Sequence, residues 1–181
     1  MILYRCFAWS RTAAADEPAG PLWFPRAYQS DGRHDNPEAY GALYVSGREV
    51  SCVVEQLGPF RGQRLHPSFL RRRGLPLAVA EIELRDGDLV DLDEPAVLAA
   101  EGLRPSCVAT RRRDVTQPQA AAIHRSHHTA AGIRWWSTFE ALWPNVTLFD
   151  RAAPLLSLLG VRELSVGDPT VLEAAELLGL S

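Results

Sequence analysis

Three histidines lie close together in the chain, at a spacing that two zinc ligands can share. His124 and His128 are four residues apart, with His127 between them. On a helix this spacing places two imidazoles on one face, as in the zinc proteases. The glutamate that completes the HExxH pattern of those enzymes is missing, because the segment reads HRSHH. We therefore favour a solvated or packed helix and expect no metal site.

Arginine supplies the whole basic charge of the chain, since no lysine occurs in it. A guanidinium binds phosphate and carboxylate through a planar fork, so these arginines could serve a phosphorylated ligand, although compositional bias of the genome explains them more simply. Two runs, 71–73 and 111–113, contain three arginines each. Short runs of this kind are typical of solvated loops and helix ends, and a net charge of −3 does not favour nucleic acid. We expect no direct nucleic-acid partner.

Length and composition indicate one globular domain over residues 1–181. Hydrophobic residues make up 46% of the 181 and charged residues 23%, which is ordinary for a soluble protein. The three cysteines are far apart, form no CxxC pair and are odd in number, which argues against a disulfide framework. Arg5 interrupts what would be the apolar core of a signal peptide, and no run reaches membrane-spanning length. These features favour the cytoplasm, with no membrane partner.

The first half of the chain predicts two strands, a long structured loop and a helix. Apolar residues favour a strand over Ile2–Phe7, and residues 22–38 lack periodicity and suit a ligand-carrying loop. A strand over Ala42–Ser46 precedes a helix over Glu49–Leu57, which Gly58 and Pro59 end.

The second half predicts short strands separated by helices. We expect strands at 77–84, 89–92, 132–137, 146–149 and 161–166, and helices from Pro95 to near Gly102, from an N-cap at Thr116 to Gly132, and over Asp168–Leu178. Many short strands with fewer helices favour an α+β or mixed α/β fold over a doubly wound one. Neither GxGxxG nor a P-loop lysine motif occurs.

Three ordered segments resemble the RES-domain family, which is named for Arg, Glu and Ser. They read GRHDNPEAYGALYVS from Gly32, SCVVEQL from Ser51 and AAGIRWWSTFEALWPNVTLF from Ala130. Together with Tyr4-Arg5 near the start, they extend the resemblance to about residue 149. One position departs from the pattern, because the residue after the loop arginine is usually aromatic in the family, whereas this chain has His34.

The resemblance implies an ADP-ribosyltransferase-like fold, with a mixed, mainly antiparallel central sheet flanked by helices. It implies cleavage of the bond between nicotinamide and ribose in NAD, by hydrolysis or phosphorolysis, so that NAD is a substrate and no cofactor is needed. It further implies a bacterial toxin of a toxin–antitoxin system, neutralised by a cognate antitoxin of the Xre, helix-turn-helix type. Homo-oligomerisation is left open.

The resemblance also assigns roles to single residues. Glu55 would stabilise the positive charge that develops on the ribose, as carboxylates do in glycoside cleavage. The remaining candidates are Arg33, with Arg5, for the pyrophosphate; Tyr44 for the nicotinamide ring; Ser137 for the ribose; and Asn145 as a support of the pocket. Of these, Glu55, Arg33 and Ser137 form the expected catalytic set.

Plain structural interpretations compete with each of these roles. Glu55 could be an exposed helical glutamate, Arg33 a solvated loop residue, and Tyr44 a packed strand residue. Ser137 could cap a following helix, and Asn145 could make a turn. Competing functions also stay open: a protein ADP-ribosyltransferase that uses NAD, a non-catalytic binding module with the RES fold, and, remotely, a nucleic-acid-binding protein.

Overall fold

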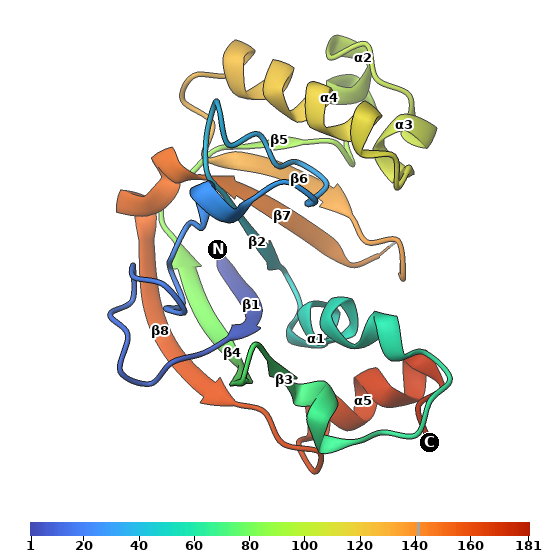
Figure 1. The fold of residues 1–181 in the computed structure, drawn as a ribbon. Coiled ribbons are helices and arrows are strands. Elements are labelled where there is room, and N and C mark those ends of the chain that lie inside the picture. Colours follow the sequence, from blue (N-terminus) through green and yellow to red (C-terminus); the bar gives the residue numbers. More distant parts are fainter. Residues whose placement is uncertain (141) are drawn as a thin grey trace. The chain divides into compact units, whose positions relative to one another are not determined.

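The computed structural model describes residues 1–140 and 142–181, which form two compact units (Figure 1). The first unit comprises Met1–Trp23, Val45–Leu84 and Ser157–Ser181, and the second comprises Phe24–Tyr44 and Arg85–Leu156. Each unit is therefore assembled from segments that are distant in sequence. The single domain expected over 1–181 stays a prediction.

In the described part of the chain, eight strands form a mixed sheet in the order β3-β4-β1-β2-β7-β6-β5, with β8 also paired to β4. Four of the strand pairs (β1–β2, β1–β4, β3–β4 and β6–β7) are antiparallel, whereas β5 and β6 are parallel. The strands are β1 (Ile2–Ala8), β2 (Ala42–Ser46), β3 (Arg71–Arg72), β4 (Leu75–Leu84), β5 (Leu89–Asp91), β6 (Gly132–Trp136), β7 (Pro144–Phe149) and β8 (Leu156–Glu163). The predicted mixed, mainly antiparallel sheet with helices is confirmed.

The first unit is built on β1 and β4, which pair from Ile2↔Glu83 to Ala8↔Leu77. Helix α1 (Glu49–Leu57) contacts both β1 and helix α5 (Pro169–Leu178). The predicted apolar face of α1 is buried, including Val53 and Leu57. At the start of α5, the side chain of Asp168 accepts a hydrogen bond from the Thr170 amide at 2.9 Å, so the predicted N-cap is confirmed. Single-turn 3₁₀ helices η2 (Gly58–Phe60) and η3 (Pro67–Leu70) follow α1.

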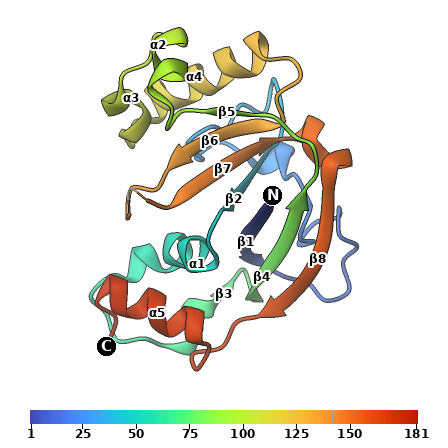
Figure 2. The same cartoon turned by 180° about the vertical axis from the view of Figure 1, so that it is seen from behind.

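The second unit places three helices, α2 (Pro95–Ala100), α3 (Pro105–Ala109) and α4 (Arg113–Ser126), beside β5 and β6 (Figure 2). It also contains the 3₁₀ helices η1 (Arg26–Tyr28) and η4 (Asp150–Leu155). One apolar cluster joins α2, α3 and α4 to β6 and β7 through Leu98, Val108, Ile123, Ile133, Trp135 and Phe149. This core supports the loop between η1 and β2, which carries Arg33. Among the helices within residues 1–140 and 142–181, none is long and apolar enough to cross a membrane.

Several predicted boundaries are wrong, and tertiary contacts explain them. Thr116 is not an N-cap: α4 begins at Arg113, and the Thr116 hydroxyl bonds the carbonyl of Arg33 instead. The helix ends at Ser126, well before Gly132, which begins β6. Strand β8 starts at Leu156 rather than at residue 161 and shows no burial alternation, because it is defined by pairing with the distant strand β4. Helix α3 was not predicted.

Candidate active site

A tight turn in the second unit carries the loop arginine. The carboxylate of Asp35 accepts a hydrogen bond from the Gly32 amide at 2.6 Å and another from the Tyr44 hydroxyl at 2.7 Å. A Cβ atom at Gly32 would overlap both the Asp35 carboxylate and the Tyr44 hydroxyl. Glycine is therefore required here by close packing rather than by an unusual backbone angle.

Arg33, the central residue of this turn, is 7% exposed. Its Nη1 donates to the carbonyl oxygens of Val108 at 2.7 Å and Thr110 at 2.6 Å, both at the end of α3. Its guanidinium carbon lies 4.5 Å from the centre of the Trp135 ring, a favourable cation–π distance. The guanidinium is thus a fixed positive charge held by backbone carbonyls and an indole face, and the solvated alternative does not describe it.

The His34 side chain is buried within the second unit, with 4% of its surface exposed. Its amide donates to the Tyr44 hydroxyl at 2.9 Å, and its Nδ1 lies 2.8 Å from Oγ1 of Thr147. Its ring meets that of Trp135 edge-on, with 5.5 Å between centroids. Burial, together with the positive charge of Arg33, lowers the pKa of His34 to about 3, so the ring is neutral at physiological pH. The histidine that departs from the family pattern therefore serves as a packed, hydrogen-bonded residue.

Arg33 and His34 pack against side chains of strands β6 and β7. Trp135 lies directly opposite Asn145, and Ile133 directly opposite Thr147, which puts all four side chains on one face of the sheet. Asn145 is 4% exposed. The Trp135 indole donates to the hydroxyl of Thr147 at 3.2 Å. Asn145 thus shares the sheet face on which Arg33 and His34 pack through Trp135.

Ser137 follows β6 and is buried. Its hydroxyl accepts a hydrogen bond from the Phe139 amide at 3.1 Å, and its own amide donates to the carbonyl of Trp143 at 2.9 Å. These contacts shape the connection between β6 and β7. They match a turn-forming role of the serine more directly than a ligand contact.

Arg5 and Glu55 belong to the first unit. Glu55 is exposed on α1. Nη1 of Arg5 donates to the carbonyls of Gly20 at 3.1 Å and Pro21 at 2.7 Å. Burial lowers the pKa of Arg5 to about 10, which leaves it charged at neutral pH. Arg5 therefore anchors the loop after β1, whereas Arg33, Tyr44, Ser137 and Asn145 belong to the second unit.

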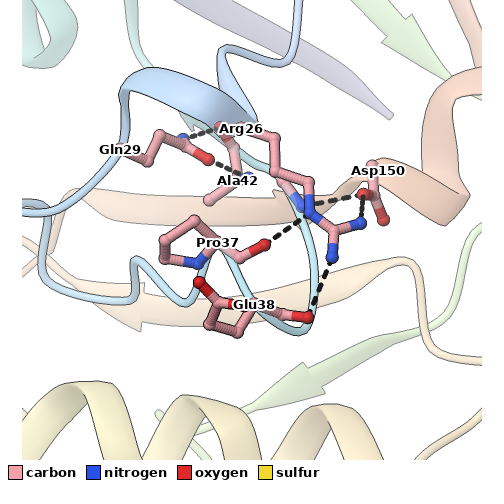
Figure 3. A network of polar contacts seen from close by, with 7 residues as sticks. Arg26, Gln29, Pro37, Glu38, Ala42 and Asp150 are labelled. Carbon is pink, nitrogen blue, oxygen red and sulfur yellow. Dashed lines mark hydrogen bonds and ion pairs between the residues drawn. The ribbon is translucent and has the colours of Figure 1, made fainter.

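A separate polar network braces the segment that carries Arg33 (Figure 3). Arg26 donates to the carbonyls of Pro37 at 2.6 Å and Glu38 at 3.0 Å, and it pairs with Asp150 at 3.5 Å. Asp150 also accepts a hydrogen bond from the Gly41 amide at 2.7 Å. The Gln29 side chain bonds both backbone groups of Ala42, as a neighbouring strand would. This network fixes the start of β2 independently of the turn at Arg33.

Reasoning from sequence missed the hydrogen-bonding partners of the loop. Asp35, Thr116 and Thr147 all bond to residues of the 32–35 turn, and the sequence predicts none of these contacts. Asp35 had a local signal, because an aspartate three residues after a loop glycine can accept a bond from the glycine amide. Thr116 and Thr147 had none, since they approach the loop only in the folded chain.

The three histidines lie at the end of α4, where His124 is packed, His127 caps the helix and His128 is exposed. The ring of His124 lies 4.5 Å from that of Tyr40 and 4.8 Å from that of Phe149, and burial lowers its pKa. Nε2 of His127 lies 2.7 Å from the carboxylate of Glu101. Over residues 1–140 and 142–181, no group of three or more His, Cys, Asp or Glu side chains could hold a metal ion.

Comparisons with known proteins identify the family. Over residues 2–166 the sequence matches the family model of the RES domain. The fold is similar to that of a chain in the crystal structure of the M. tuberculosis MbcT–MbcA toxin–antitoxin complex, with a TM-score of 0.66 and 18% identity, covering 98% of this chain and 88% of that one. A search of curated proteins finds no match. The family match extends over far more than half of the sequence, so the chain belongs to the RES domain family.

Proposed function

We propose that this protein is the toxin of a toxin–antitoxin system and that it cleaves the nicotinamide–ribose bond of NAD. The observation that carries the proposal is the RES domain match over residues 2–166. The fold similarity to a chain of a toxin–antitoxin complex supports the toxin role and a cognate antitoxin as partner. The Xre type of that antitoxin rests on the family resemblance alone. NAD cleavage rests on the family resemblance of the three sequence segments.

In the proposed reaction, the bond between ribose C1′ and the nicotinamide nitrogen breaks. The electron pair goes to nicotinamide, whose ring loses its positive charge, and the ribose becomes an oxocarbenium-like cation. The Glu55 carboxylate stabilises that cation by its negative charge. Water then adds to C1′ and releases a proton, giving ADP-ribose; phosphate in its place gives the phosphorylated sugar.

Arg33 is the proposed pyrophosphate contact. Its charge is held in place by the carbonyls of Val108 and Thr110 and by the Trp135 ring, which supports a preorganised cation for an anionic substrate. Arg5 is proposed to assist it. The ring of Tyr44 would pack against nicotinamide, while its hydroxyl is engaged with Asp35.

Two further residues complete the proposed site. Ser137 would contact the ribose, although its hydroxyl already accepts a bond from the Phe139 amide. Asn145 would support the pocket from the sheet face that it shares with Trp135.

Product analysis tests this proposal and identifies the acceptor. Purified protein is incubated with NAD in buffer alone, with inorganic phosphate, and with cell extract. Free nicotinamide with ADP-ribose indicates hydrolysis, a phosphorylated sugar indicates phosphorolysis, and label transferred from NAD to protein indicates a protein ADP-ribosyltransferase. Intact NAD under all three conditions would refute NAD cleavage, and NAD that binds unchanged would favour the non-catalytic module.

Expression in bacteria tests the toxin role. The wild-type protein should arrest growth and deplete cellular NAD, and Glu55→Gln should relieve both effects. Glu176→Gln is a matched control, because Glu176 is another exposed glutamate on a helix of the same unit. Equal growth of cells that express wild type and Glu55→Gln would contradict the assignment of Glu55.

A further inference from the structure

The turn that carries Arg33 is closed by side chains. The Asp35 carboxylate accepts from the Gly32 amide at 2.6 Å and from the Tyr44 hydroxyl at 2.7 Å. We infer that Asp35 is a positioning residue for Arg33, acting through the Gly32 amide and the Tyr44 hydroxyl. We call these three groups the Asp35 clasp. The inference rests on the proposed function of Arg33 at the NAD pyrophosphate.

Burial makes the clasp specific. Asp35 is 6% exposed, and each of its two carboxylate oxygens accepts a hydrogen bond from a different donor. A carboxylate withdrawn from water is stabilised by such donors, and bonds to a charged acceptor are stronger than neutral ones. The two donors come from the turn itself and from β2, so the carboxylate ties the turn to the sheet.

The Tyr44 hydroxyl links the clasp to the residue that follows Arg33. It donates to Asp35 and accepts a bond from the His34 amide at 2.9 Å. Burial, together with the nearby charge of Asp35, raises the pKa of Tyr44 well above its ordinary value, so the hydroxyl keeps its proton and can serve as the donor. The backbone is thereby held at Gly32 and His34, one residue before and one residue after Arg33.

The guanidinium depends on this backbone position. The Arg33 side chain reaches from the turn to the end of α3, where it donates to Val108 and Thr110, and its carbonyl accepts from the Thr116 hydroxyl at 2.6 Å. A shift of the turn would move the start of that side chain while its far end stays attached to α3. Small displacements of a binding group are costly for catalysis, so the clasp should control how well Arg33 meets its ligand.

Asp35→Asn and Tyr44→Phe test the clasp in the whole protein. Asparagine has one acceptor oxygen, so either the Gly32 amide or the Tyr44 hydroxyl loses its acceptor. Phenylalanine keeps the ring that is proposed to face nicotinamide and removes only the hydroxyl. Each variant should raise KM for NAD about tenfold and leave kcat within about threefold, because a pyrophosphate contact stabilises bound substrate and transition state alike.

Asp150→Asn is the matched control. Asp150 accepts a bond from another glycine amide of the same segment, that of Gly41, but belongs to the Arg26 network. The KM of Asp150→Asn for NAD should equal that of wild type. A loss of folded protein would lower the apparent kcat at unchanged KM, so the two effects separate. An unchanged KM in Asp35→Asn, or an equal rise in Asp150→Asn, would overturn the inference.

Amide hydrogen exchange measured by NMR tests the clasp without NAD. Asp35→Ala, which removes both acceptor oxygens, should accelerate exchange at Gly32, and Tyr44→Phe should accelerate exchange at His34, each about tenfold or more relative to wild type. Unchanged exchange rates at both amides would refute the clasp, whether or not the protein cleaves NAD. Accelerated exchange in a protein that leaves NAD intact would instead locate the failure in the proposed function.

Discussion

Removing the charge of Arg33 should destabilise the protein even in the absence of any ligand. Arg33→Met keeps much of the side-chain volume and removes the donor to the carbonyls of Val108 and Thr110, 2.7 and 2.6 Å away. A hydrogen bond from a charged donor contributes about 1.5–3 kcal/mol, and a cation–π contact such as that with Trp135 contributes about 0.5–2 kcal/mol. Relief from burying the charge offsets part of this loss.

We therefore expect Arg33→Met to lower the free energy of unfolding by about 2–4 kcal/mol. In a protein of this size, that corresponds to a fall in Tm of about 5–15 °C. The assay is thermal unfolding followed by circular dichroism, supported by urea denaturation. Arg104→Met is the control, because Arg104 is exposed in the same unit and should change stability by less than about 0.5 kcal/mol. A Tm for Arg33→Met within about 2 °C of wild type would refute the view of Arg33 as a residue that ties the loop to α3.

The other predictions concern Gly32, His34 and the cap of α5. Gly32→Ala should cost about 2–4 kcal/mol in urea denaturation because its Cβ would overlap the Asp35 clasp, whereas Gly167→Ala, with open space around its Cβ, should be near neutral; equal effects would contradict the packing argument. Between pH 6.5 and about 3, the unfolded chain binds a proton on His34 that the folded chain excludes, so the free energy of unfolding should fall as the pH falls, by up to about 1.4 kcal/mol per pH unit from this residue. His34→Asn should remove this contribution. An identical pH profile for the variant and wild type would contradict the lowered pKa of His34. Asp168→Ala should destabilise the protein by about 1–2 kcal/mol through loss of the cap of α5 and of the ion pair with Arg162, and no change in urea midpoint would contradict that role.

Local sequence signals were sufficient where an element is defined by its own pattern. The helix over Glu49–Leu57 has its apolar residues on one face and glycine and proline at its end, and the structure places it over the predicted residues. The capping aspartate and first-turn proline of α5 likewise identified its start. The ordered motifs led to the RES domain family, which the family match then showed.

Local sequence patterns did not predict structure that depends on contacts between distant residues. Thr116 has the residue type of an N-cap, but its hydroxyl serves the Arg33 carbonyl across 83 residues, and the helix extends past it toward the N-terminus. Strand β8 has no alternating pattern and exists because β4 offers a partner. The candidate site shows the same limit, since Arg33 could be named from a motif, whereas its contacts with α3 and Trp135 form only in the folded chain. The roles assigned to the six site residues stay predictions.

Release of nicotinamide from NAD, followed over time by chromatography, tests the central claim most directly. The account predicts that the wild-type protein releases nicotinamide, that Glu176→Gln does so at the same rate, and that Glu55→Gln is slower by about a hundredfold or more, as expected when a group that stabilises developing charge is removed. The account would be contradicted by wild-type protein that releases no nicotinamide with water, phosphate or cell extract as acceptor, or by equal rates for wild type and Glu55→Gln.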